Sequence, residues 1–363
     1  MTLVFFMGTA AELIKMVPIL NECEKRNIPW KAVSSGQASA DFLRQWNEFQ
    51  LPLEKLIELD KKSQALKSAP QALFWFCRTF VFKLKTVVSL APDTHHYIVV
   101  HGDTITTLLG SIMARLIGRH LIHVESGLNS HSLLNPFPEE INRRICSRLA
   151  EYNFAPNQAA AENLARKKIK GKIINTEFNT MVESLTHNME NFRMPEEEFG
   201  ICNIHRFENL INDDRLQTIV DVIQEASHKF KLIFFMSEST KHKFENDSKW
   251  KSFLANPNIE FRGRASFLTF RNYLYGCQFI ITDSGSNQEE CYYLGKPCLI
   301  MRSTTERTEG LNENCLLSNY DKKKADEFLS HLEKYKRSPV RASTPPSQII
   351  VETLLAREQS EHE

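Results

Sequence analysis

The sequence has no marked excess of charge of either sign. Its 45 Lys and Arg residues balance 44 Asp and Glu residues, which leaves a formal net charge of +1. A chain this close to neutrality gives no reason to expect nucleic-acid binding or attraction to an acidic membrane surface through bulk charge. Functions that depend on a strongly basic or strongly acidic protein are therefore not indicated.

The sequence also lacks a CxxC pair and the Cys and His spacing of a zinc site. Its cysteines occur singly, mostly among apolar residues, at Cys23, Cys77, Cys146, Cys202, Cys277, Cys291, Cys298 and Cys315. We therefore expect no structural metal site. Because no secretory signal peptide is evident either, we expect reduced, buried thiols and a cytoplasmic location.

No hydrophobic run is long enough to cross a membrane. The most apolar segment, residues 70–92, contains Leu73-Phe74-Trp75-Phe76 but is interrupted by Arg78, Lys83 and Lys85. One interpretation of this segment is a helix lying in a membrane interface. We favour the other, a helix in the core or at a dimer contact, because it accounts for the same residues.

The chain has no internal repeat of solenoid length, and its 363 residues exceed what one ordinary core requires. Short apolar runs alternate with helical patterns, and this alternation occurs twice. Two such sets of βαβ units predict an α/β protein with two Rossmann-like, doubly wound domains and a cleft between them. We place the N-terminal domain at residues 1–170, the C-terminal domain at 171–345, and a terminal helix at 346–363 that packs on the N-terminal domain.

The apolar runs predict strands, and the helical patterns predict the segments between them. The predicted strands are residues 3–7, 30–34, 97–100, 120–124, 152–155, 172–175, 200–204, 232–236, 279–282 and 297–301. The predicted helices are residues 11–25, 40–49, 105–117, 158–167, 213–228, 240–253, 267–275, 288–294, 322–335 and 348–357, with one more beginning at Pro138.

Three carboxylates follow two of the predicted strands. Asp103 and Glu125 each come just past the carboxyl end of a strand, where open α/β sheets bind ligands, and Glu139 lies in the first turn of the helix begun by Pro138. Three carboxylates in one crevice suit proton abstraction or stabilisation of a cationic transition state. The structural alternative is that Asp103 caps the next helix and Glu139 pairs with a helix dipole, and spacing alone leaves both interpretations open.

Lys15 is a further candidate. It lies one turn into the first predicted helix, among the apolar residues Leu13, Ile14 and Met16. The simpler alternative is an ordinary surface lysine.

Two strand-to-helix turns are suited to binding an anion. Gly8-Thr9 and Ser284-Gly285-Ser286 both place small residues and free backbone N–H groups at a helix N-terminus, and Arg307 can add a cation to the second. Any βα unit needs such a turn, so each one alone is weak evidence. Two of them, with the carboxylates between, indicate a diphosphate ligand that carries a sugar.

Seven motifs occur in a fixed order over almost the whole chain. They are Gly8-Thr9 with Glu12 and Ile14-Lys15-Met16; His101-Gly102-Asp103-Thr104; His123-Val124-Glu125 with Gly127-Leu128; Asn135-Pro136-Phe137-Pro138-Glu139-Glu140-Ile141-Asn142-Arg143; His205-Arg206 with Glu208-Asn209; Thr282-Asp283-Ser284-Gly285 with Gln288-Glu289-Glu290; and Thr304-Thr305-Glu306-Arg307. In these motifs the chain resembles the UDP-N-acetylglucosamine 2-epimerases, most closely the bacterial non-hydrolysing type.

The resemblance implies a glycosyltransferase-B architecture, a homodimer, and no metal or nicotinamide cofactor. It implies interconversion of UDP-GlcNAc and UDP-ManNAc through UDP elimination and a 2-acetamidoglucal intermediate, which supplies surface polysaccharide synthesis. A UDP-sugar is then the expected small-molecule partner, and the second domain is expected to hold the UDP.

The resemblance also implies roles for individual residues. Those implied for catalysis are Asp103, Glu125, Glu139 and His205, with Lys15 close to the chemistry. Those implied for UDP-sugar binding are Gly8, Thr9, Arg143, Phe270, Ser284, Gly285, Ser286, Glu290 and Arg307. Among these, Phe270 is expected beside the uracil, and Ser284, Gly285 and Glu290 around the ribose and phosphate.

The sequence departs from the family pattern at several positions. Ala10-Ala11 stand where the family usually has Arg-Pro, Asn129 where it has Arg, and Ser286 where it has Gly. Ala38 stands where many bacterial members carry a His of a second, activating UDP-GlcNAc site. These departures keep three alternatives open: a hydrolysing epimerase that releases ManNAc, an epimerase for a modified UDP-2-acetamido sugar, and a catalytically weakened UDP-sugar-binding protein. The retained carboxylates favour an epimerase, and the central motif favours one over a glycosyltransferase of the same fold.

Overall fold

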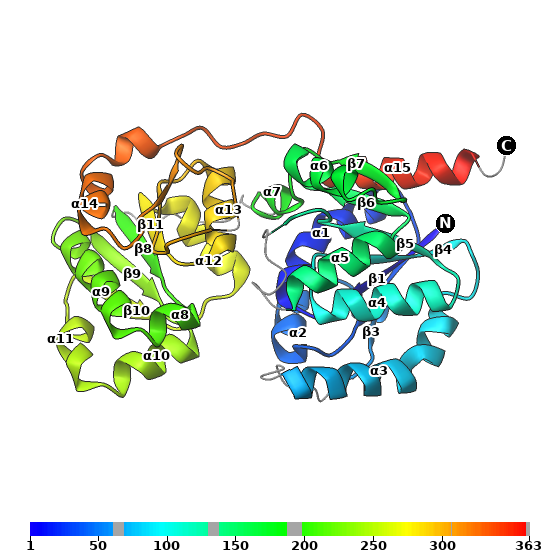
Figure 1. Ribbon diagram of the computed structural model, residues 1–363, viewed down its shortest axis with the longest axis horizontal. Coiled ribbons are helices and arrows are strands. Elements are labelled where there is room, and N and C mark those ends of the chain that lie inside the picture. Colours follow the sequence, from blue (N-terminus) through cyan, green and yellow to red (C-terminus); the bar gives the residue numbers. More distant parts are fainter. Residues whose placement is uncertain (61–68, 130–137, 187–197, 306, 361–363) are drawn as a thin grey trace. The chain divides into compact units, whose positions relative to one another are not determined.

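In the computed structural model the chain forms two compact units (Figure 1). The first unit comprises Met1–Ser184 with Ala342–Glu363, and the second comprises Leu185–Arg341. The structure describes residues 1–60, 69–129, 138–186, 198–305 and 307–360. The predicted boundary after residue 170 precedes β7 (Lys172–Asn175), which pairs with β6 (Tyr152–Ala155), so the first unit extends to Ser184.

The described part of the first unit contains a seven-stranded sheet in which all neighbouring strands are parallel. In sheet order the strands are β3 (Leu56–Glu58), β2 (Trp30–Ser34), β1 (Thr2–Met7), β4 (His96–His101), β5 (His120–Val124), β6 (Tyr152–Ala155) and β7 (Lys172–Asn175). The central strands are runs of Val, Ile, Leu and Phe with almost no exposed residue, because both faces of a parallel sheet are covered. The strand order reverses between β1 and β4. The carboxyl ends of these two strands are therefore the switch point, where such sheets bind ligands.

Helices connect these strands and cover the sheet. They are α1 (Ala10–Lys25), α2 (Ser39–Glu48), α3 (Ala69–Leu90), α4 (Ile105–Leu116), α5 (Glu139–Leu149), α6 (Gln158–Arg166), α7 (Met181–Ser184), α15 (Pro346–Ser360) and the short 3-10 helix η1 (Leu53–Lys55). On one face of the sheet, Phe6 and Val100 pack with Trp75 of α3 and Leu109 of α4. Side chains alternate between the two faces along a strand, so the neighbouring Phe5 faces the opposite way.

The last helix, α15, returns to the first unit after the chain has formed the second. It packs against α1, where Arg26 pairs with Glu352 at 2.7 Å. Near the other end of α15, Glu358 accepts a hydrogen bond from the Tyr97 hydroxyl at 2.8 Å. These contacts tie residues from opposite ends of the sequence into one unit.

The second unit repeats the topology of the first. Its described residues form a six-stranded parallel sheet in the order β10 (Ile259–Arg262), β9 (Lys231–Phe235), β8 (Phe199–Asn203), β11 (Phe279–Thr282), β12 (Cys298–Ile300) and β13 (Cys315–Leu317). Its helices are α8 (Phe207–Leu210), α9 (Asp213–Ser227), α10 (Glu238–Glu245), η3 (Ser248–Trp250), α11 (Lys251–Leu254), α12 (Phe267–Gly276), α13 (Gly285–Leu294), α14 (Lys322–Ser330) and η4 (Leu332–Tyr335). The prediction of an α/β protein with two doubly wound domains is confirmed.

Two predicted helices are shorter than expected. The helix predicted at 240–253 is interrupted after α10, where the Asp247 side chain accepts from the Lys249 N–H and begins η3 instead. Asp and Asn favour such caps over helix interiors because their side chains compete for backbone groups. The helix predicted at 322–335 likewise ends at Ser330 and continues as η4.

The aromatic-rich segment forms α3, and no helix in the described residues is long and apolar enough to cross a membrane. Trp75 and Val87 lie in the core, whereas Phe74 and Phe82 on the opposite face are 70% and 73% exposed. The expectation of a core helix therefore holds for one face of α3 only.

Candidate active site

The turn after β4 brings Asp103 next to the residue that ends β5. Gly102 adopts a positive φ of 66° and its N–H donates to Val124 O at 2.9 Å. Glu125 also lies in the left-handed region, with φ 58°. Such a backbone costs a residue with a Cβ on the order of 1–2 kcal/mol, so it persists only where the surroundings hold it.

Glu125 forms a buried ion pair with Lys15, which reaches it from α1. The two residues are only 8% and 6% exposed. The Asn179 amide also donates to Glu125 Oε2, and His101 Nε2 lies 4.0 Å from that oxygen. Two opposite charges removed from water are tolerated because they pair. The alternative interpretation of Lys15 as a surface lysine is therefore wrong.

Asp103 does not cap the helix that follows it. Thr104 is the N-cap of α4, and its hydroxyl accepts the Thr107 N–H at 3.1 Å. The Asp103 carboxylate instead forms an ion pair with Arg143, and the Asn142 side chain donates to Asp103 O at 2.9 Å. The structural alternative for Asp103 is wrong, and α5 delivers both partners that fix its position.

Glu139 is the first residue of α5, directly after Pro138 in the N-cap position. Its Oε2 is buried and has no hydrogen-bond partner in the described residues. None of the described contacts joins it to Asp103 or Glu125. The structure thus confirms its first-turn position, while its convergence with the other carboxylates stays a prediction. Residues 135–137 of the same motif lie outside the described residues.

Gly8 and Thr9 differ from the predicted anion-binding turn. Both backbone N–H groups already donate to the Glu12 carboxylate, at 2.8 and 2.9 Å, in a capping box. Burial raises the pKa of Glu12, although hydrogen bonds from Thr104 and from this turn oppose the shift. A Cβ at Gly8 would lie 2.2 Å from Thr106 Oγ1, so close packing explains the glycine. These two N–H groups are therefore not available to a phosphate in this structure.

In the second unit, the buried Asp283 shapes the turn that carries His205. Its carboxylate accepts the N–H groups of His205 and Arg206 at 3.0 Å each, and the Asn209 side-chain amide at 2.9 Å. His205 Nδ1 lies 3.5 Å from Asp283 Oδ1, while 41% of the imidazole side chain is exposed. Asp283 thus fixes the backbone of His205, while the imidazole ring stays accessible to a ligand.

The second turn predicted to bind an anion lies at the N-terminus of α13. Ser284 is the N-cap and accepts the Asn287 N–H at 3.4 Å. In the part of the chain that the structure describes, the N–H groups of Gly285 and Ser286 have no acceptor. Glu290, one turn further, accepts from the Asn287 amide at 2.8 Å. This turn therefore has unsatisfied donors at a positive helix end, which the first turn lacks.

The remaining predicted ligand residues lie near this turn or on α12. Arg307, the cation predicted for this turn, pairs with the buried Glu289 of α13 at 2.9 Å. Phe270 of α12 packs edge-on against Phe235, with ring centroids 5.2 Å apart. Glu306, the neighbour of Arg307, lies outside the described residues.

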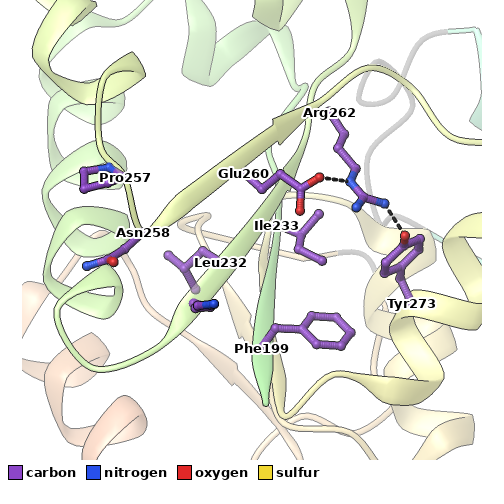
Figure 2. Close-up of a pocket in the computed structure, with 9 residues that line it drawn as sticks. Phe199, Leu232, Ile233, Pro257, Asn258, Glu260, Arg262 and Tyr273 are labelled. Atoms are coloured by element: carbon purple, nitrogen blue, oxygen red, sulfur yellow. Dashed lines mark hydrogen bonds and ion pairs between the residues drawn. The ribbon is translucent and has the colours of Figure 1, made fainter. Parts of the chain in front are cut away.

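A pocket of about 360 Å³ lies beside β9 and β10 of the second unit (Figure 2). Its lining residues are Phe199, Lys231, Leu232, Ile233, Pro257, Asn258, Glu260, Arg262 and Tyr273. Arg262 donates to Glu260 at 2.6 Å and to the Tyr273 hydroxyl, so these polar groups satisfy one another. None of the predicted site residues lines this pocket.

Two residues that position the site were missing from the predicted set. Asn179 donates to Glu125 from a position 54 residues further along the chain, and local sequence spacing cannot predict a contact over that distance. Asp283 was visible only as part of a motif, and its position between a buried strand and a helix is the signal for a turn-forming carboxylate.

Comparison with known proteins places these features in context. A family model described as UDP-N-acetylglucosamine 2-epimerase matches residues 21–345. A UDP-N-acetylglucosamine 2-epimerase of Bacillus subtilis is 29% identical over 96% of this chain and 93% of its own, and that of Methanocaldococcus jannaschii is 29% identical over 85% and 86%.

Solved structures show the same likeness. The M. jannaschii UDP-GlcNAc 2-epimerase in complex with UDP-GlcNAc and UDP is 27% identical, with a TM-score of 0.81, and the match covers 98% of this chain and 100% of that one. The Neisseria meningitidis UDP-GlcNAc 2-epimerase bound to UDP-GlcNAc is 25% identical, with the same TM-score and coverage.

Proposed function

Since the chain belongs to the UDP-N-acetylglucosamine 2-epimerase family, we propose that it interconverts UDP-GlcNAc and UDP-ManNAc without hydrolysing them. The two sugars differ only in configuration at C2. The product is proposed to supply surface polysaccharide synthesis, as the resemblance of the motifs implies.

The proposed reaction begins with departure of UDP. The C2 hydrogen is not acidic, so a base alone cannot remove it. Cleavage of the C1–O bond sends the electron pair to UDP and builds positive charge at C1, which carboxylates stabilise. Loss of the C2 proton to a protein base then forms the C1=C2 bond of 2-acetamidoglucal. Return of UDP to C1, with protonation of the opposite face of C2, gives the epimer.

Asp103, Glu125 and Glu139 are the proposed acid–base and charge-stabilising groups. Lys15 and Arg143 support this role because they form ion pairs with Glu125 and Asp103 and hold these two carboxylates in place. An ionised carboxylate is the form that accepts a proton or stabilises an oxocarbenium ion.

The second unit is proposed to hold the UDP. Gly285 and Ser286 would donate their N–H groups to a phosphate at the start of α13, with Ser284, Glu290 and Arg307 around the ribose and diphosphate. Phe270 is proposed beside the uracil and His205 beside the reacting sugar. For Gly8 and Thr9 we propose a packing role in the first unit and no hydrogen bonds to the phosphate, because their backbone N–H groups already donate to Glu12.

The observation that carries the proposal is the buried Lys15–Glu125 pair at the switch-point edge, in a chain whose family acts on UDP-GlcNAc. The test is incubation with UDP-GlcNAc followed by proton NMR. Appearance of UDP-ManNAc without free sugar supports the proposal. Free ManNAc together with UDP would indicate the hydrolysing alternative. No turnover of UDP-GlcNAc would be the result for an enzyme that requires a modified UDP-2-acetamido sugar. Binding of UDP-sugars without turnover of any of them would indicate a weakened binding protein.

We also propose that a second copy of the chain covers the exposed face of α3, giving a homodimer. Leu73, Phe74 and Phe82 are exposed there, and Arg78 within this face is already ion-paired with Asp60. Because the charge of Arg78 is compensated by Asp60, this face fits a protein partner better than an anionic lipid surface.

Light scattering should report a dimer that becomes a monomer on combined Phe74→Glu and Phe82→Glu substitution. Leu53→Glu, at an exposed apolar residue outside α3, is the matched control, and an unchanged dimer in the double variant would contradict the proposal.

A further inference from the structure

The segment between β7 and α7 holds Glu125 in place. Its Asn179 is 3% exposed and its amide donates to Glu125 Oε2, the oxygen that also pairs with Lys15. Both donors belong to the first unit. One carboxylate oxygen thus receives an ammonium from α1 and an amide from this segment.

The orientation of the Asn179 amide is fixed by its other end. Its Oδ1 accepts the Met181 N–H at 3.2 Å. The oxygen of an Asn side chain only accepts, and its NH2 group only donates. The hydrogen-bond network therefore assigns the NH2 group to the side that faces Glu125.

The same segment and α7 also fix the helix that carries Lys15. The Thr180 hydroxyl of the segment donates to Lys15 O, and the Ser184 hydroxyl of α7 donates to Ile14 O at 2.6 Å. Asn179 and Thr180 are adjacent, so the carboxylate and its ammonium partner are positioned from one short stretch of backbone. A small displacement of that stretch would move both.

Glu125 needs such support because its backbone is in the left-handed region. We propose that Asn179 is a positioning residue for epimerisation, which holds the ionised Glu125 carboxylate in the orientation that the reaction uses. This inference rests on the proposed function of Glu125. Asn179 acts through Glu125, to which its amide donates.

The substitution Asn179→Asp tests this role with little change in size. The new side chain keeps an acceptor for the Met181 N–H but replaces the donor to Glu125 with a second carboxylate. Asn175→Asp is the matched control, because Asn175 Oδ1 accepts the Glu177 N–H at 2.9 Å in the same kind of turn. The Asn175 amide donates to Gln158 instead, at 3.1 Å.

Asn179→Asp should lower kcat on the order of 10- to 100-fold, the usual effect of losing a hydrogen bond to a charged group. The KM for the UDP-sugar should stay within about threefold, since the UDP is held by the other unit. The acidic limb of the kcat/KM profile should move to higher pH, because the ionised carboxylate loses a donor. Lys15, His101 and His123 are charged or titratable groups that interact with Glu125 and can contribute to this profile. Wild-type kcat in Asn179→Asp, or an equal loss in Asn175→Asp, would overturn the inference.

A second measurement does not depend on activity. In protein labelled with carbon-13 at the glutamate carboxyls, the Glu125 resonance is the one lost in Glu125→Gln. Its titration midpoint should rise by about one pH unit or more in Asn179→Asp relative to Asn175→Asp, and an unchanged midpoint would overturn the positioning role. If wild-type protein fails to epimerise UDP-GlcNAc, the proposed function fails while this titration still decides the role of Asn179.

Discussion

Replacing Glu125 with glutamine removes one charge of the buried pair and keeps the size of the side chain. If Glu125 takes part in the chemistry, kcat should fall by about 10²- to 10⁴-fold, the usual effect of removing an acid–base or charge-stabilising group. The same substitution leaves the Lys15 ammonium without this counter-charge in a site where both residues are under 10% exposed. Breaking a buried ion pair from one side costs about 3–5 kcal/mol.

The stability effect can be separated from the chemical effect with a second substitution. Because the glutamine oxygen still accepts from Lys15, we expect a loss near 3 kcal/mol, or roughly 6–12 °C in melting temperature for a unit of this size. Adding Lys15→Met removes the uncompensated charge and should restore most of the melting temperature. It should not restore kcat, since the carboxylate is still missing.

The assay combines thermal melting, turnover of UDP-GlcNAc followed by NMR, and UDP titration by calorimetry. UDP affinity should stay within about twofold in both variants, because the ligand is proposed to sit on the second unit. Recovery of turnover together with stability in the double variant would refute the reasoning. It would show that Glu125 serves only to neutralise Lys15.

Three further predictions concern other parts of the molecule. Asp283→Asn should lower kcat at least tenfold by releasing the turn that carries His205, as measured by initial rates, and unchanged rates would exclude this support. Burial alone would raise the pKa of Glu358, but hydrogen bonds from the N-terminal ammonium, Tyr97 and His95 lower it from 4.5 to about 2. The ionised Glu358 therefore stabilises the fold fully above pH 4.5, and this stabilisation is lost as the pH falls towards 2. The difference in melting temperature between wild type and Glu358→Gln should shrink over that range, and a constant difference would contradict the prediction. Ala38 offers a methyl group where an imidazole would bind an activator, so kinetics from pure UDP-ManNAc should be hyperbolic without added UDP-GlcNAc, and a lag abolished by traces of UDP-GlcNAc would disprove this.

The central strands were predictable from sequence because they are buried on both faces. Strands β2, β5, β6 and β11 occupy the predicted residues, and all their residues except Lys31 and His120 are buried. The three strands that were not predicted, β3, β10 and β13, all lie at sheet edges. An edge strand is short, pairs on one side and is only partly buried, so its sequence carries a weaker apolar pattern.

The candidate site was predictable at the level of motifs but not of contacts. The positions of Asp103 and Glu125 follow from strand ends, which the apolar pattern locates. The partner of each carboxylate could not be read from spacing, because Lys15 and Arg143 reach them over 110 and 40 residues. The sequence also could not predict that the N–H groups of Gly8 and Thr9 are occupied, because a capping box and an anion-binding turn share the same small residues.

The central claim is that epimerisation breaks the C2–H bond. It is tested most directly by running the reaction with unlabelled UDP-GlcNAc in D2O and examining C2 of both UDP-sugars by NMR. The account predicts deuterium at C2 of the UDP-ManNAc formed and of the UDP-GlcNAc recovered, with none in the Glu125→Gln variant on the same timescale. Epimerised product that retains only protium at C2 would contradict the account, because it would require a route that never exchanges that hydrogen with water.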